Sequence, residues 1–259
     1  MIENLMTHWW WDIIATVISI GLLTLIVNIN GKLQEKEILP SYITRKLVHI
    51  LAGPVYLLTW MLFTGNEYSR YFAMLVPILF IVKFAAVGLG LMKDDDLVNS
   101  TSRTGNPREL LGGTLHYSIA MLLCTIFIFD AGIGVFNPSS LVIIGILAGG
   151  DGLADIFGRK WGKKSFGIGG ATKTLAGSFG MLVGSFVTPL LMILAFTLRG
   201  EIQINDILLP LLILSVVATL VEAFSPKDFD NITLTILLFV GLILLSEFTD
   251  LWPYVYFNM

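Results

Sequence analysis

The chain has 259 residues, of which 55% are hydrophobic and only 14% are charged, and its mean hydropathy is +0.81. This composition is typical of a membrane protein, because a water-soluble domain of this size needs more polar surface. The 16 Lys and Arg residues are outnumbered by 19 Asp and Glu residues, so we expect no nucleic-acid partner. The single cysteine, Cys124, excludes an internal disulfide framework and a cysteine-based metal site.

Long apolar stretches recur along the whole chain. A bilayer core of about 30 Å is crossed by roughly 20 apolar residues in a helix. The connections between the stretches are short, so we predict one integral membrane domain over residues 1–259, an all-α bundle of about eight transmembrane helices. The expected spans are 9–29, 47–63, 71–92, 114–130, 139–157, 174–198, 207–224 and 232–249.

The basic residues gather in the connections after the first, third, fifth and seventh expected spans. Because cytoplasmic loops are enriched in Lys and Arg, we predict that this face is cytoplasmic and that both termini lie on the opposite side. The tryptophans at 9–11 and Trp252 are expected at the membrane interface, as parts of aromatic belts.

Lys83 departs from this distribution, because it falls inside the third expected span. A lysine at such a position normally needs a carboxylate partner or a polar cavity. The candidates for its partner are Asp151, Asp155 and Glu222.

Two carboxylates mark the end of the fifth span. Asp151 and Asp155 are four residues apart, hence on one face of a helix, and Arg159 follows one turn later. Mg²⁺ prefers oxygen ligands, and acids inside a membrane span are costly unless they have a function. The pattern therefore indicates a magnesium site. The alternative is a solvated ion pair between Asp155 and Arg159 at a helix end.

The next connection is basic and rich in glycine. It contains Lys163 and Lys164, then Gly167, Gly169 and Gly170. Glycine-rich backbone presents N–H groups to phosphate, and a helix N-terminus, expected here near residues 173 and 174, favours anions. This pattern suits a polyphosphate. The alternative is that these cations only obey the positive-inside rule and contact anionic lipid.

Two further groups have open interpretations. Arg45, Lys46 and His49 begin the second span, and His49 could orient phosphate or act as a base, or be an ordinary interfacial histidine. A second oxygen-rich cluster of Glu222, Asp228, Asp230 and Asn231 could equally be a helix–loop boundary with a capping residue.

Five runs together resemble the successive signatures of the polyprenol kinases, a family that contains phytol, farnesol and dolichol kinases. The runs are RKLVHILAG at 45–53, SRTGNPRELLGGTLHY at 102–117, GDGLADIFGRKWG at 150–162, KTLAGS at 173–178 and VEAFSPKDFDN at 221–231. SRTGNPREL and KTLAGS are most similar to the phytol kinase branch. The resemblance implies a membrane enzyme that transfers the terminal phosphoryl group of a nucleoside triphosphate, typically CTP, to an isoprenoid alcohol such as phytol, geranylgeraniol or farnesol.

The resemblance also implies roles for individual residues. Asp151 and Asp155 fall on the family's acidic motif and would hold Mg²⁺, and His49 and Lys173 join them as candidate catalytic residues. Two other functions stay open: a CTP-dependent lipid-phosphate cytidylyltransferase, although its closing signature is absent, and a transporter, although no inverted repeat is evident. The expected nucleotide-binding residues are Arg45, Lys46, Arg103, Asn106, Gly152, Arg159, Lys163, Lys164, Thr174 and Gly177.

Overall fold

The computed structural model describes residues 8–131, 137–166, 172–197, 202–225 and 229–254. The chain divides into two compact units, an N-terminal unit (Met1–Gly134 with Asn258–Met259) and a C-terminal unit (Val135–Phe257). Each unit is taken by itself below. The single domain expected over the whole chain stays a prediction.

The structure confirms a helical, multi-pass membrane protein. Among the described residues, seven helical stretches are long and apolar enough to cross a membrane. The expected span at 47–63 falls instead on a helix that begins earlier, at Ser41, and is less apolar because it carries Arg45, Lys46 and His49. The seven stretches are Trp10–Glu35, Ser69–Gly88, Pro107–Ile128, Ser139–Trp161, Leu175–Ala195, Ile204–Phe224 and Asp230–Phe248.

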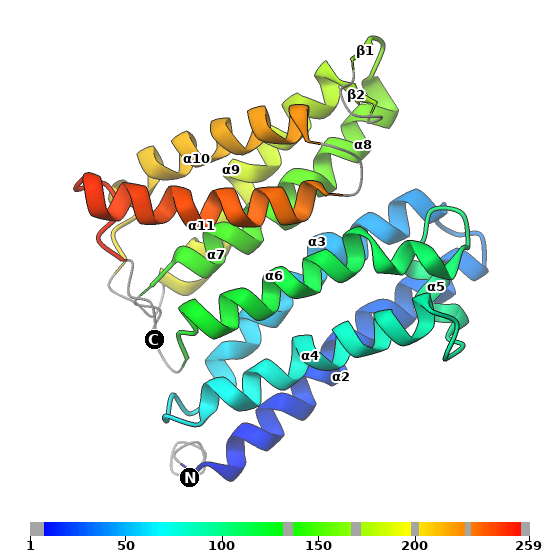
Figure 1. The fold of residues 1–259 in the computed structure, drawn as a ribbon, viewed down its shortest axis with the longest axis horizontal. Helices are drawn as coiled ribbons and strands as arrows, with labels where there is room; N and C mark the ends of the chain where they lie inside the picture. Colours follow the sequence, from blue (N-terminus) through cyan, green and yellow to red (C-terminus); the bar gives the residue numbers. More distant parts are fainter. Residues whose placement is uncertain (1–7, 132–136, 167–171, 198–201, 226–228, 255–259) are drawn as a thin grey trace. The chain divides into compact units, whose positions relative to one another are not determined.

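The N-terminal unit is a bundle around α2 and α4 (Figure 1). Helix α2 packs against α3, α4 and α5, and α4 packs against α6. The elements are α2 (Trp10–Glu35), α3 (Ser41–Thr59), a 3₁₀ turn (Trp60–Leu62), α4 (Ser69–Gly88), α5 (Asp95–Thr101), a second 3₁₀ turn (Pro107–Leu111) and α6 (Gly113–Ile128).

A buried acid fixes the first turn of α2. Asp12 is fully buried, and its carboxylate accepts hydrogen bonds from the backbone N–H of Thr64 at 2.8 Å and from the Ser69 hydroxyl at 2.8 Å. The Thr64 hydroxyl donates a third, at 3.0 Å. A buried carboxylate is tolerated only when it is hydrogen-bonded in this way. Asp12 therefore joins α2 to the end of the connection between α3 and α4 and to the first residue of α4.

The partner of Lys83 lies in the connection after its own helix. The Lys83 ammonium is 2.7 Å from the Asp94 carboxylate. The prediction that it pairs with Asp151, Asp155 or Glu222 is therefore wrong. Lys83 lies near the end of α4, where its long side chain reaches the polar connection.

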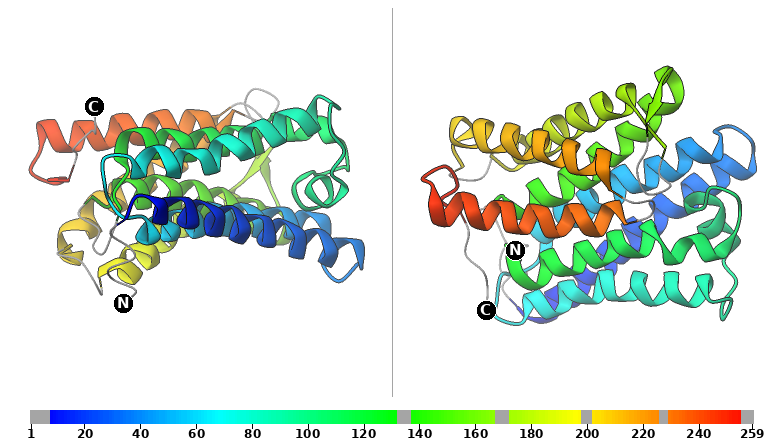
Figure 2. Two further views of the ribbon diagram at one scale, coloured as in Figure 1. Left: turned by 90° about the horizontal axis from the view of Figure 1, so that it is seen from below. Right: turned by 45° about the horizontal axis from the view of Figure 1, so that its top comes forward.

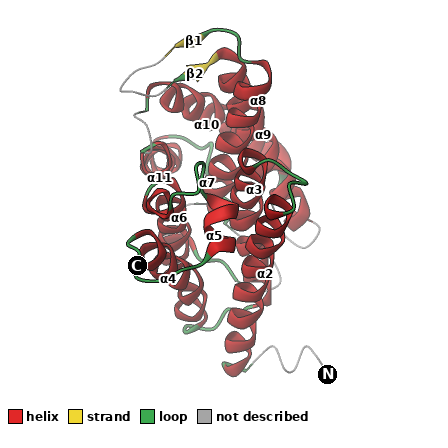
Figure 3. Ribbon diagram, turned by 90° about the vertical axis from the view of Figure 1, so that its right-hand side faces the viewer, coloured by secondary structure: helices red, strands yellow, loops and turns green. Residues whose placement is uncertain are grey.

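The C-terminal unit is built on α9, which packs along the helical stretch Ser139–Trp161 and against α10 (Figures 1 and 2). Helices α10 and α11 lie side by side. A two-stranded antiparallel ribbon, β1 with β2, follows α8 and is an element that the all-α prediction omitted (Figure 3). The elements are α7 (Ser139–Gly145), a π-helical turn (Ile146–Gly150), α8 (Asp151–Trp161), β1 (Ser165–Phe166), β2 (Lys173–Thr174), α9 (Leu175–Thr197), α10 (Ile204–Phe224) and α11 (Asp230–Phe248).

Glycines bring α9 close to the helical stretch from α7 to α8. A Cβ at Gly184 would overlap the backbone oxygen of Gly149, and a Cβ at Gly180 would lie 2.6 Å from the backbone oxygen of Leu153. Small residues allow such close approach, which is the usual way that membrane helices pack. Gly149 thus has a packing role.

The indole of Trp252 lies inside the C-terminal unit. It is fully buried, and its Nε1–H donates to the Ser139 hydroxyl at 2.9 Å. Its side chain therefore packs inside the protein beside a hydrogen-bond partner, and the expected place of Trp252 at the membrane interface stays a prediction. Trp9, in contrast, is 59% exposed.

Candidate active site in the C-terminal unit

The π-helical turn positions the first candidate carboxylate. Its five residues are all buried, and Asp151 follows directly as the first residue of α8. A π turn inserts an extra residue into the helical ladder and occurs often at functional sites. Asp151 is half-buried, and it stands where the buried apolar turn gives way to the more polar α8.

Asp155 forms an ion pair within α8. Its carboxylate is 2.9 Å from Nε of Arg159, one turn later, and Arg159 is half-exposed. This is the ion pair considered as the alternative to a metal site. An exposed i,i+4 pair of this kind contributes only about 0.3–0.5 kcal/mol, so a ligand could readily compete for either partner.

The ammonium of Lys173 joins three elements of the unit. Lys173 belongs to β2. Its ammonium forms an ion pair with Glu222 on α10 and is 4.0 Å from the carboxylate of Asp230, the first residue of α11. Glu222 is almost fully buried, at 4% exposure. The second oxygen-rich cluster predicted from the sequence is thus linked directly to Lys173.

Asp151 also belongs to this charged group. Its carboxylate interacts electrostatically with that of Glu222, as does the carboxylate of Asp230. Two further carboxylates, those of Asp151 and Asp230, thus act on the Lys173–Glu222 ion pair. Carboxylates repel a polyphosphate, and a cation that accompanies the polyphosphate reduces this repulsion.

The donor set fits a magnesium ion that arrives with a nucleotide. Within the ranges that the structure covers, no three His, Cys, Asp or Glu side chains are grouped closely enough to hold a metal by themselves. Mg²⁺ usually binds through one or two carboxylates plus substrate phosphates rather than in an all-protein cage. Asp151 and Asp155, on one face of α8, can supply those carboxylates.

Thr174 and Gly177 hold β2 against α8. The Thr174 hydroxyl accepts a hydrogen bond from the backbone N–H of Gly177 at 3.0 Å, which caps the first turn of α9. A Cβ at Gly177 would lie 3.1 Å from the backbone oxygen of Ala154, so this glycine allows α9 to approach α8. Gly152 is buried within α8. The contacts of Thr174 and Gly177 indicate structural roles for both.

Three further lysines of the described residues lie at the end of α8 and in the connection that follows it. Lys163 and Lys164 are exposed, and the Lys160 ammonium lies 4.8 Å from the centre of the Trp161 ring. Exposed lysines are accessible to phosphate. Gly167, Gly169, Gly170 and Asp228, which the sequence analysis also considered, lie outside the described residues.

The N-terminal unit holds the candidates of α3. Lys46 is buried, at 2% exposure, and the His49 ring lies 4.2 Å from the ring of Tyr117 on α6. Tyr117 was not predicted as a neighbour of His49, although it ends the run 102–117 that supports the family resemblance.

Arg103 and Asn106 lie in the exposed connection between α5 and α6. The Asn106 side chain accepts a hydrogen bond from the backbone N–H of Arg108 at 3.0 Å, and the backbone N–H of Arg103 donates to the Glu109 carboxylate. These contacts shape the connection and leave the Arg103 side chain exposed.

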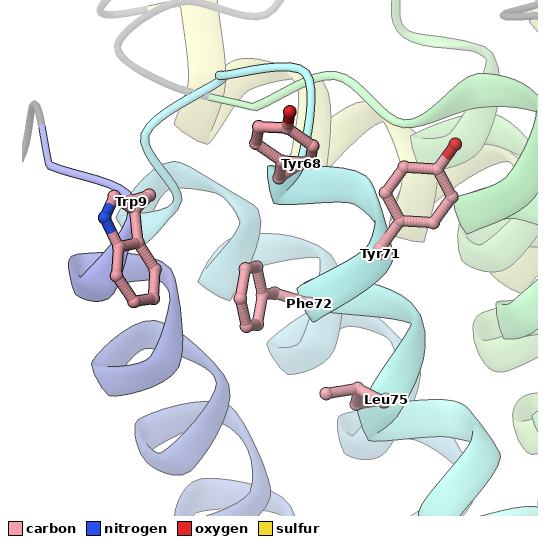
Figure 4. A pocket seen from close by; sticks show the side chains of 5 residues that line it. All are labelled: Trp9, Tyr68, Tyr71, Phe72 and Leu75. Atoms are coloured by element: carbon pink, nitrogen blue, oxygen red, sulfur yellow. The ribbon is translucent and has the colours of Figure 1, made fainter.

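An aromatic pocket of about 550 Å³ lies elsewhere in the N-terminal unit (Figure 4). Trp9 borders it from the start of α2 and Phe72 from α4, and none of the lining residues is charged. Such a wall suits hydrocarbon rather than phosphate. The pocket contains none of the predicted site residues, and it is lined by Trp9, Tyr68, Tyr71, Phe72 and Leu75.

Comparison with known proteins identifies the family. The chain is 34% identical over 211 residues to a probable phytol kinase of Glycine max, a match that covers 81% of this chain and 68% of the relative. It is 31% identical over 219 residues to phytol kinase 1 of Arabidopsis thaliana, covering 84% and 70%. It is 34% identical over 209 residues to the farnesol kinase of Arabidopsis thaliana, covering 80% and 66%.

No family model matches the chain, and no solved structure matches it. The similarity to the curated kinases extends over most of the chain and includes both units. The chain therefore belongs to the polyprenol kinase family, the family of the phytol and farnesol kinases.

Proposed function

We propose that this chain transfers the terminal phosphoryl group of CTP to the hydroxyl of an isoprenoid alcohol in the membrane, with phytol as the first substrate to test. Membership of the family makes the chain a phosphotransferase with an alcohol acceptor. The observation that carries the proposal is the carboxylate pair of α8 followed directly by an exposed, lysine-rich connection.

Phosphoryl transfer depends mainly on alignment and on neutralisation of charge. Asp151 and Asp155 are the residues that would hold Mg²⁺, which supplies charge neutralisation at the phosphates when it is bound. Lys163 and Lys164 would bind the outer phosphates, and Lys173 would add a shielded cation beside α8. Arg45, Lys46, Arg103, Asn106 and Arg159 remain candidates for nucleotide contacts.

The acceptor hydroxyl needs a base and a place at the membrane surface. His49 and the two aspartates of α8 are the candidate bases, since each could accept a proton from an alcohol. We also propose that the basic connections face the cytoplasmic side, where the nucleotide is available, and that both termini face the other side. The alcohol would then reach its site laterally, with its tail in the bilayer.

Labelled nucleotides test this function. The purified chain is incubated with Mg²⁺ and CTP carrying the label at either the α- or the γ-phosphorus, together with phytol, geranylgeraniol or farnesol. We expect the γ-label alone to enter the lipid. Entry of the α-label would instead indicate cytidylyl transfer, and parallel reactions with ATP, GTP and UTP measure the preference for CTP.

A further inference from the structure

The position of Lys173 is set by residues that are remote from it in the sequence. Glu222, its ion-pair partner, is 49 residues away at the end of α10, and Asp230 begins α11. The strand that carries Lys173 is only two residues long. Its side chain therefore depends on α10 and α11 for its direction.

Burial makes this dependence strong. The side chains of Lys173 and Glu222 are 17% and 5% exposed, so solvent and salt screen their attraction less than at the surface. A lysine side chain is flexible, and fixing it loses much rotamer freedom. An ammonium that is already held binds a phosphate with a smaller loss of entropy.

The Lys173 ammonium keeps the capacity to bind a ligand. It has three N–H donors, and Glu222 accepts one of them. The 4.0 Å separation from Asp230 is within ion-pair range but beyond a hydrogen bond. A phosphate oxygen could therefore accept a second donor while the pair with Glu222 stays intact.

We propose that Glu222, supported by Asp230, is a positioning residue that holds the Lys173 ammonium for the nucleotide phosphates. This inference rests on the proposed function, because it assigns Lys173 to nucleotide. A positioning role and a purely repulsive role of Glu222 predict opposite changes in nucleotide affinity when the carboxylate is removed. Removing a carboxylate that only repels anions would tighten nucleotide binding, whereas removing one that positions Lys173 weakens it.

The change in affinity is measured by equilibrium binding of Mg·CTP to the purified chain. The KM for CTP gives a second measurement during turnover. We expect Glu222→Gln to weaken binding by about tenfold, because a shielded, charge-assisted contact is lost. Asp230→Asn should have a smaller effect, about threefold, because its carboxylate is farther from the ammonium. Glu222→Asp should recover part of the affinity, and Asp94→Asn, which removes the Lys83 ion pair of the N-terminal unit, should leave it unchanged.

A double variant tests whether Glu222 acts through Lys173. We expect Lys173→Met to weaken Mg·CTP binding and Glu222→Gln to add nothing when Lys173 is already replaced. Additive effects would overturn the proposal, as would tighter or unchanged binding in folded Glu222→Gln. If Glu222→Gln does not fold, unchanged affinity in both Glu222→Asp and Asp230→Asn overturns it.

The two proposals fail separately. A wild-type chain that binds Mg·CTP but transfers no label to any isoprenoid alcohol would count against the kinase proposal. The binding series would still decide the role of Glu222, because it needs no turnover. A variant whose unfolding temperature falls while its Mg·CTP affinity stays at the wild-type value would show Glu222 to be structural only.

Discussion

Asp94 contacts Lys83 and at the same time begins a helix. One carboxylate oxygen lies 2.7 Å from the Lys83 ammonium, and the other accepts a hydrogen bond from the backbone N–H of Leu97 at 2.9 Å. The second contact is the N-cap of α5. A single side chain thus neutralises a lysine of a membrane span and fixes the start of the polar connection that follows.

The two roles of Asp94 can be separated by substitution. Asparagine also caps helices, so Asp94→Asn should lose the ion pair and keep the cap, whereas Asp94→Ala should lose both. We expect Asp94→Ala to be less stable than Asp94→Asn by about 1 kcal/mol, the usual contribution of an N-cap. Thermal unfolding in detergent measures the difference. Equal unfolding temperatures would show that the cap contributes nothing.

Gly184 offers a test of the packing between α9 and the helical stretch Ser139–Trp161. A Cβ at this position would overlap the backbone oxygen of Gly149, and backbone cannot move aside as a side chain can. We expect Gly184→Ala to destabilise the chain by about 1–3 kcal/mol through overpacking. The measurement is again the unfolding temperature.

Gly21 is the matched control for this substitution. It lies in α2, and a Cβ there would meet nothing within 4 Å. Gly21→Ala should be neutral or slightly stabilising, because alanine has the higher helix propensity. Similar losses of stability in Gly184→Ala and Gly21→Ala would mean that close packing at Gly184 does not cause the destabilisation.

The helices were predictable because each depends on a local pattern. A run of about 20 apolar residues determines a membrane span regardless of its neighbours. The predicted boundaries fail where helices continue into polar sequence. The first span, expected to end at 29, continues to Glu35, and α3 begins at Ser41 rather than 47. Polar residues end the apolar run without ending the backbone hydrogen bonding of the helix.

The site was predictable only where it is local. Asp151, Asp155 and Arg159 follow the helical period, so their shared face and the ion pair of Asp155 could be expected. The pairing of Lys173 with Glu222 depends on how α9, α10 and α11 pack, and no spacing in the sequence encodes that. Lys83 shows the same limit, since its partner was sought among the acids near other span ends and lies in the adjacent connection.

Asp12 provides a test far from the proposed chemistry. Its buried carboxylate accepts hydrogen bonds from Thr64 and Ser69, and the loss of an acceptor leaves buried donors without partners. We expect Asp12→Ala to lower the free energy of unfolding by about 2–4 kcal/mol, while the KM for CTP in the folded fraction stays unchanged. A shift in that KM with normal stability would contradict a purely structural role.

Asp151→Asn tests the metal-binding carboxylate directly. Asparagine has the same shape and keeps an oxygen, but it lacks the charge that favours Mg²⁺. We expect kcat/KM for phosphoryl transfer to fall by about 100-fold or more, with an unfolding temperature close to that of the wild type. Asp155→Asn should have a smaller effect, because Arg159 already pairs with that carboxylate and offsets part of its charge. Asp206→Asn, in the first turn of α10, is the matched control and should leave turnover unchanged. Near-normal turnover of Asp151→Asn at saturating Mg²⁺ would remove Asp151 from the site.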